Sequence, residues 1–175
     1  MGEGGMEVGV VTFGDVADAQ RLIDSLQQAG AIGKVDELGI IEHDTNGKFS
    51  IHSFAPGATR GQHIGMGALV GGLIGTLMGP FGLIAGILGG AGVGASMLSR
   101  DPHELEISDA FVASLRDALP NGSSAVLIIG IPETVEQFMG RIRAHGAVST
   151  AELHEPLNEA QVKVLREALE KGGTA

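Results

Sequence analysis

Cysteine, tryptophan and tyrosine are absent from this sequence of 175 residues. The lack of cysteine excludes disulfides, thiol catalysis and cysteine-ligated metal sites, and it suits a reducing cytoplasm. The lack of Trp and Tyr removes the aromatic residues that commonly line the membrane–water interface. Basic residues are scarce too, because 11 Lys and Arg stand against 21 Asp and Glu, giving a formal net charge of −10. Since phosphates repel such a chain, we expect no nucleic-acid partner.

Charge is missing altogether from one long stretch, residues 64–98, which are 35 consecutive positions without a charged side chain. Within this stretch glycine recurs at every fourth position, in two series separated by Pro80. The eight positions are Gly67, Gly71, Gly75, Gly79, Gly82, Gly86, Gly90 and Gly94. A spacing of four places each series on one face of a helix, while apolar residues cover the rest of both helices. The pattern is typical of a glycine zipper, in which helices contact each other through glycine faces.

The glycines indicate that these helices pack closely against a partner. Glycine inside a helix costs roughly 1 kcal/mol relative to alanine, so eight of them require a compensating interaction. Close approach of two helix backbones, which the missing Cβ permits, is the usual compensation. Gly79-Pro80 interrupts the pattern, because a residue before proline avoids the α region and proline fits the first turn of a helix. We therefore predict a helical hairpin with arms at Ile64–Met78 and Phe81–Leu98.

The length of the hairpin leaves two environments open. Residues 61–79 and 80–98 give two arms of 19 residues each, close to the roughly 20 residues that cross a bilayer. Arg60 and Arg100 stand at the two ends, as expected for a hairpin inserted from the cytoplasmic side. We expect insertion into the cytoplasmic membrane, with the rest of the chain facing the cytoplasm. The alternative is a cytoplasmic soluble assembly whose subunits bury their hairpins against each other.

The two segments that flank the hairpin alternate between strand-like and helix-like patterns. Apolar, β-branched runs predict strands, and apolar residues spaced by three and four predict helices. The predicted strands are residues 7–13, 38–43, 48–54, 124–129 and 147–153. The predicted helices begin at Asp15, at Asp101-Pro102, shortly before Val135 and at Asn158. Asp44-Thr-Asn-Gly47 predicts a tight turn, and residues 1–6 lack the basic region of a secretory signal.

The two flanks repeat each other at a constant offset of 116 residues. Val10 matches Val126, and Gly30-Ala-Ile32 matches Gly146-Ala-Val148. Each flank therefore holds a strand, a helix, a glycine stop and a second strand, which makes two βαβ halves. Two such halves predict an α+β, ferredoxin-like sandwich with the hairpin inserted between them. The predicted divisions are residues 1–60 for the first half, 61–100 for the hairpin, 101–156 for the second half and 157–175 for a C-terminal helix and tail.

Several segments of the chain together resemble a known family. They are VVTFGDVADAQRLIDSL near the N-terminus, the glycine-rich hairpin, ISDAFVASLRDALPNGSSAVLIIG after it, and a helix–glycine–strand ending followed by LREAL. In this order they resemble the bacterial and archaeal domain of unknown function 1269 family, whose members are commonly labelled predicted membrane proteins. The resemblance implies a membrane-linked or self-associating protein without an established activity, so it assigns no catalytic residues.

Motifs for catalysis, cofactors and metals are weak. Gly90-Ala-Gly-Val-Gly-Ala95 fits a loose dinucleotide pattern but lacks the preceding strand that this pattern requires. The histidines are spread one per predicted element, at positions 43, 52, 63, 103, 145 and 154, although folding or subunit contact could still assemble a metal site. Ser123 and Ser124 follow a turn, where local hydrogen bonding is the expected role. We expect no catalytic residue and no cofactor, and we identify no small-molecule substrate.

These patterns predict a non-enzymatic, membrane-associated scaffold that forms homo-oligomers through its glycine-zipper hairpin. The expected partners are further copies of the chain and lipid, either as a bilayer or as enclosed lipid. A soluble homo-oligomeric shell or particle that encloses lipid or other cargo is the first alternative. The second is a small-molecule or metal-binding regulatory module, which rests on fold analogy alone.

Overall fold

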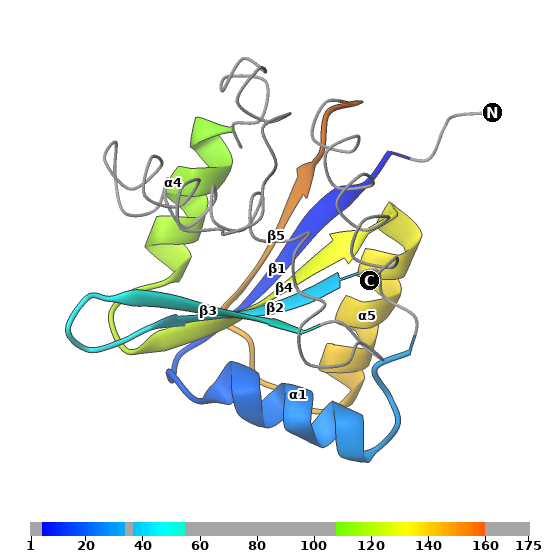
Figure 1. Cartoon of the computed structure of the whole chain (residues 1–175), viewed down its shortest axis with the longest axis horizontal. Helices are drawn as coiled ribbons and strands as arrows, with labels where there is room; N and C mark the ends of the chain where they lie inside the picture. The colour runs from blue at the N-terminus through cyan, green and yellow to red at the C-terminus, as the bar shows by residue number, and fades with distance from the viewer. Residues whose placement is uncertain (1–4, 34–36, 55–107, 160–175) are drawn as a thin grey trace, which may run out of the picture.

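A computed structural model describes residues 5–33, 37–54 and 108–159 of the chain. These residues form an antiparallel sheet of five strands and three helices (Figure 1). The strands are β1 (Glu7–Phe13), β2 (Glu37–His43), β3 (Phe49–Phe54), β4 (Ser123–Gly130) and β5 (Ala151–Pro156). The helices are α1 (Asp18–Gln28), α4 (Asp109–Ala118) and α5 (Pro132–Ala144). The strand order is β3-β2-β4-β1-β5, which confirms the prediction of a mixed fold of helices and strands.

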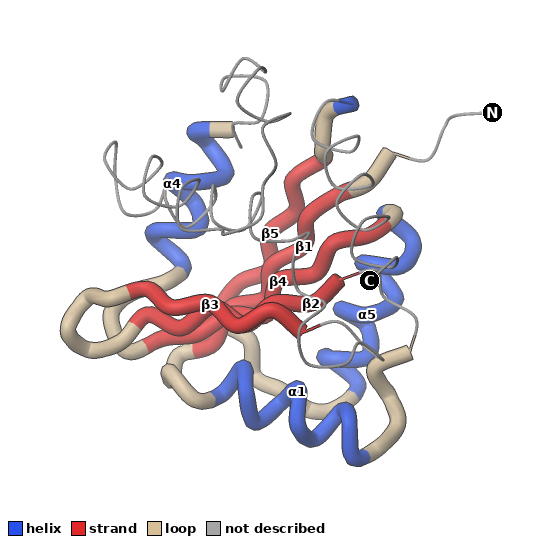
Figure 2. The backbone as a smooth tube through the Cα atoms, in the orientation of Figure 1, coloured by secondary structure: helices blue, strands red, loops and turns tan. Residues whose placement is uncertain are grey.

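Helices cover both faces of the sheet, as Figure 2 shows. On one face, α1 and α5 contribute Ile23 and Phe138 to an apolar cluster that includes Val11 of β1. On the other face, α4 contributes Phe111 to a cluster that includes Val10. Neighbouring residues of a strand point to opposite faces, so Val10 and Val11 belong to different clusters. Because β4 lies inside the sheet and is covered on both faces, all eight of its residues are buried.

The repeat predicted at an offset of 116 residues corresponds to two similar units, β1-α1-β2 and β4-α5-β5. Their helices both end at a glycine with positive φ, Gly30 at 64° and Gly146 at 81°, a conformation that favours glycine over residues with a side chain. The ladder between β1 and β4 pairs Val10 with Leu127 and Val11 with Val126. The approximate two-fold axis of the repeat therefore passes between these two pairs, at the centre of the sheet.

The last described strand starts later than predicted, at Ala151 and not at residue 147. The chain joins the sheet at Thr150, whose backbone N–H donates to the carbonyl of Thr12 at 2.8 Å, while the two Thr Oγ1 atoms lie 2.7 Å apart. Residues 147–149 form the connection from α5, and Val148 there is 86% exposed. The apolar residues of this connection gave a strand-like pattern without strand pairing.

One predicted helix start was also wrong in position. α1 begins at Asp18, because Asp15 uses Oδ1 to accept from the backbone N–H of Ala17 at 2.9 Å, ahead of the helix. α4 begins at Asp109 and is capped by Ser108, whose Oγ accepts from the N–H of Phe111 at 3.2 Å. Residues 101–107, where the earlier start was predicted, and the helix predicted after Asn158 lie outside the described residues.

The free ends of the described segments gather at one end of the sheet. Glu7 pairs with Gly130 and with Pro156, and Phe54 pairs with Leu38 at the start of β2. β1 and β2 therefore begin, and β3, β4 and β5 end, on the same side of the sheet, which we call the insertion end. The opposite side, which we call the turn end, holds the turn from Asp44 to Gly47 between β2 and β3.

The hairpin predicted at residues 61–100 lies outside the residues that the structure describes. Among the described helices, none has the length and apolar character needed to cross a bilayer.

Candidate functional site

The predicted site residues are all in the segment between β3 and α4 that the structure does not describe. They are the eight zipper glycines (Gly67, Gly71, Gly75, Gly79, Gly82, Gly86, Gly90 and Gly94), Pro80, and the flanking Arg60 and Arg100. The described residues instead define where this segment leaves and rejoins the folded body. The insertion end of the sheet is therefore the candidate site.

Both junctions with this segment lie at the insertion end. Phe54 closes β3, an edge strand, directly beside the start of β2. Ser108, the cap of α4, donates its backbone N–H to Glu155 Oε1 of β5 at 3.2 Å. A carboxylate at a helix N-terminus interacts favourably with the free N–H groups and the helix dipole there. Glu155 thus fixes the point at which residues 55–107 return to the body.

The first and last strands are joined at the same end. The backbone N–H of Leu157 donates to the carbonyl of Met6 at 2.9 Å. Both side chains are buried, at 8% and 7% exposure, in the cluster on the α4 face. The start of β1 and the exit from β5 are therefore held together beside the start of α4.

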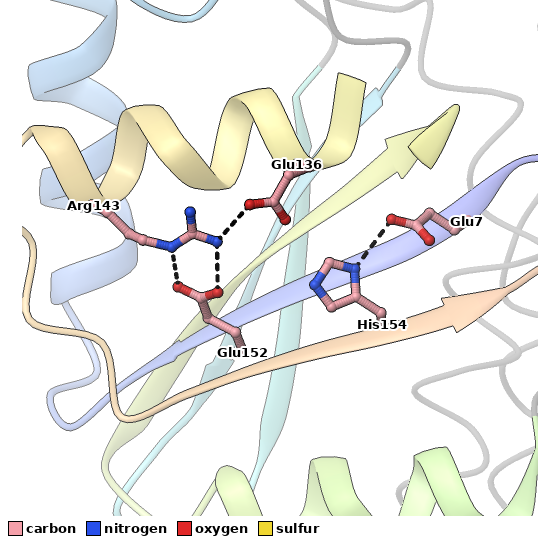
Figure 3. A network of polar contacts seen from close by, with 5 residues as sticks. All are labelled: Glu7, Glu136, Arg143, Glu152 and His154. Atoms are coloured by element: carbon pink, nitrogen blue, oxygen red, sulfur yellow. Dashed lines mark hydrogen bonds and ion pairs between the residues drawn. The ribbon is translucent and has the colours of Figure 1, made fainter. Parts of the chain in front are cut away.

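A polar network connects β5 to α5, the helix on the face of the sheet opposite α4 (Figure 3). Arg143 of α5 forms two hydrogen bonds with Glu152, from Nε to Oε1 and from Nη2 to Oε2, each of 2.9 Å. Its Nη2 also donates to Glu136 Oε1 at 3.0 Å. These bonds raise the pKa of the Arg143 guanidinium, and the bonds from Arg143 lower the pKa of Glu152. Each charged group in this network bonds to a group of opposite charge, so the network holds α5 and β5 in position relative to each other.

The second part of Figure 3 lies closer to the insertion end. His154 Nδ1 of β5 is 3.1 Å from Glu7 Oε1 of β1. The Glu7 side chain is 15% exposed and the His154 side chain 39% exposed. Among the described residues, no group of three or more His, Asp or Glu is placed to hold a metal ion. This pair therefore joins two strands, and it is not part of a larger ligand set within the described residues.

The serines predicted to bond at a turn take different roles. Ser123 Oγ donates to the carbonyl of Pro120 at 2.5 Å, which is the predicted local bond. Ser124 Oγ instead donates to the carbonyl of Asp15 at 2.6 Å and accepts from the N–H of Ala19 at 3.1 Å. It thus supplies a cap for α1 from a distant strand. Sequence reasoning missed this role because capping signals are sought in residues next to the helix.

A cavity of about 530 Å³ lies at the turn end, away from the candidate site. It is bounded by the last turns of α4, the end of β1 and the start of β5. The lining residues are Phe13, Gly14, Ser114, Asp117, Ala118, Pro120, Thr150, Ala151 and Leu153. Asp117 is its one charged residue, and the lining includes neither His nor Lys that could act as a base toward Ser114. This lining does not form a nucleophile–base pair.

Comparison with family models places the chain in a family. The model described as "Protein of unknown function (DUF1269)" matches residues 65–170, more than half of the chain, and the chain belongs to this family. The matched region includes most of the predicted hairpin together with α4, β4, α5 and β5, and it confirms the resemblance found in the sequence. The comparisons with curated proteins and with solved structures gave no match.

Proposed function

We propose that this chain is a non-enzymatic scaffold in which a ferredoxin-like body presents a glycine-zipper hairpin that joins it to other copies and to the cytoplasmic membrane. The body faces the cytoplasm, and the hairpin comprises residues 61–100. The contact face consists of the eight glycines from Gly67 to Gly94, with Pro80 at the bend.

The observation that carries this proposal is the position of the two junctions. Residues 55–107 leave from Phe54 and return at Ser108, and both lie at the insertion end of the sheet. A segment that leaves and returns on one side of a body suits two antiparallel arms, whereas a single span would separate its ends by the thickness of a bilayer, about 30 Å. The absence of charge from residues 64–98 adds to this support.

The ferredoxin-like assignment is supported by strand order. If β3 is set aside, the remaining strands lie in the order β2-β4-β1-β5, and α1 and α5 both pack on one face. Each helix connects two strands that are separated by one strand between them, which is the split βαβ arrangement. β3 and α4 are then additions, and the hairpin is inserted between these two additions.

Within the described residues, the charged contacts of the body connect its elements to one another, which suits a scaffold. Its ionisable groups are mostly paired with one another or solvated on helix surfaces, as with Arg143 and its two carboxylates. A scaffold requires only stable contact surfaces, so no catalytic constellation is needed.

Cell fractionation tests the proposal. The untagged protein is expressed, membranes are washed with carbonate, and the material that stays in the supernatant is sized by light scattering. Retention in the washed membranes is expected. Detergent-solubilised Gly75→Leu or Gly86→Leu protein is expected to form smaller oligomers while its far-UV circular dichroism stays unchanged. Leu73→Phe is the control, since Leu73 lies about 200° around the helix from Gly75.

An oligomer of unchanged size in both glycine variants would overturn the zipper. Recovery of large particles without detergent would instead favour the alternative, a soluble shell that encloses lipid or cargo. The absence of Trp and Tyr is the observation that favours this alternative, because it removes the usual interfacial anchors.

A further inference from the structure

The two edge strands of the described sheet differ in chemistry. β5 has the sequence Ala-Glu-Leu-His-Glu-Pro, with ionisable residues at three of its six positions and a final proline. β3 has the sequence Phe-Ser-Ile-His-Ser-Phe, without Asp, Glu, Lys, Arg or Pro. Charged residues and proline are what keep an edge strand from pairing with another chain. Of the two edges, β5 has this protection and β3 does not.

None of the described helices packs chiefly on β3. α1 packs chiefly on β4, β1 and β2, and α5 packs chiefly on β1 and β4. Within the described residues β3 pairs with β2 alone. No described strand pairs with the outer row of its backbone N–H and C=O groups, and each such group forms a strong hydrogen bond when a partner is present.

Charge decides where another copy of this body can approach. The described residues include 14 Asp and Glu against 5 Lys and Arg. Two of these cations, Arg21 and Arg143, already contact carboxylates of their own chain. Two such bodies repel each other over most of their surfaces, and the repulsion is smallest along a strand without formal charge. The uncharged edge is β3.

We propose that β3 pairs in antiparallel orientation with β3 of a second copy, which extends the sheet across two bodies. A two-fold axis perpendicular to the sheet keeps each face continuous, so every residue opposes one that points to the same face. Two central registers satisfy this condition, one with Ile51 on the axis and one with His52 on the axis. The second opposes two imidazoles, which repel when protonated, whereas the first opposes two β-branched residues. The inferred register therefore places Ile51 opposite Ile51, and Phe49 opposite Ser53.

This contact is independent of the hairpin. The hairpin would join copies through residues 61–100, and β3 joins bodies in pairs. Failure of one contact therefore leaves the other measurable.

Single-cysteine crosslinking of the full chain tests the contact, because the natural chain has no cysteine. Residues directly opposite in an antiparallel pair have Cα atoms about 4.5–5.5 Å apart, within the range that a disulfide bridges. Ile51→Cys is expected to give a disulfide-linked dimer under mild oxidation, at several-fold higher yield than Ser53→Cys. In the inferred register the two residues at position 53 are displaced by four positions, about 13 Å along the strand, and cannot form a disulfide.

A charge variant provides the second measurement. Ser53→Lys places a cation at the pairing edge, opposite Phe49 of the other copy, and is expected to halve the mass of the smallest assembly measured by light scattering. Val148→Lys is the control, because Val148 lies in an exposed loop at the turn end.

Each result of these two experiments either supports the β3 contact or overturns it. Preferential crosslinking at position 51, together with loss of pairing in Ser53→Lys, supports the β3 contact whatever the hairpin does. Equal yields at positions 51 and 53 indicate random collision within an oligomer and overturn it. No crosslink in folded Ile51→Cys protein also overturns it, and this is the result expected if residues 55–107 of the same chain cover the edge.

Discussion

A single methyl group at Gly9 tests how closely α5 packs on β1. Gly9 is buried in the middle of β1, and a Cβ built there would lie 2.5 Å from Val135 Cγ1 and 2.8 Å from Met139 Cε. The Met139 contact involves the end of a flexible side chain, which can move. Val135 is fully buried and β-branched, so its χ1 angle in a helix is almost fixed. The contact with Val135 therefore determines the cost of the substitution.

Gly9→Ala is expected to lower the free energy of unfolding by about 1–3 kcal/mol, the usual cost of inserting a methyl group into a packed core. This cost exceeds the roughly 0.5–1 kcal/mol that replacing glycine inside a strand would otherwise gain. Denaturant unfolding followed by far-UV circular dichroism measures it, because the chain has no tryptophan for fluorescence. Gly5→Ala is the control, since a Cβ at Gly5 has no atom within 4 Å.

A double-mutant cycle with Val135→Ala isolates the contact. Val135→Ala alone removes buried methyl groups and is expected to cost about 2 kcal/mol. In that background Gly9→Ala is expected to be neutral or stabilising, because its methyl group occupies the vacated space. A penalty of the same size in both backgrounds would show that Val135 is not the obstacle, and it would refute the reasoning.

Three further variants probe the polar contacts. Arg143→Gln removes the bonds that lower the pKa of Glu152, a stabilisation present above the unfolded pKa of Glu and lost as pH falls through the lower folded value. Its stability deficit is thus expected at neutral pH and absent in acid, and a pH-independent deficit would contradict it. Ser108→Ala removes the α4 cap and is expected to cost about 1 kcal/mol by denaturant unfolding. Ser124→Ala leaves the buried N–H of Ala19 without the hydroxyl that accepts from it, whereas the carbonyl of Asp15 keeps its bond from the N–H of Asp18, and the same assay is expected to show a loss of about 1–3 kcal/mol.

Local patterns predicted the body well where each element carries its own signal. β1 and β4 were found within about one residue of their predicted bounds because continuous apolar runs mark buried strands, and β2 and β3 because alternation marks strands as well. The repeat at 116 residues predicted both glycine stops, Gly30 and Gly146, because a left-handed C-terminal residue has a strong sequence preference.

The sequence patterns did not predict contacts between residues that are far apart in the chain. The α1 start depends on Ser124, a residue 105 positions away from the N–H that it caps. The bond between Arg143 and Glu152 depends on where the end of α5 lies relative to β5, which no spacing along one element encodes. β5 itself carries ionisable residues at three of its six positions, and the more apolar connection before it gave the stronger strand signal. Within the candidate site, the residues predicted for the hairpin remain predictions. The position of the two junctions at one end of the sheet was established by the strand register and not by the sequence.

The adjacency of β1 and β4 has a consequence for the order in which this protein folds during its synthesis. β1 is complete early in translation, but its neighbours on both sides, β4 and β5, are made only after residues 55–107. Contacts so distant in sequence form late, because a long loop must close before they add stability. The glycine-rich segment therefore leaves the ribosome while the sheet is still open, and it is accessible to other molecules before the body has folded.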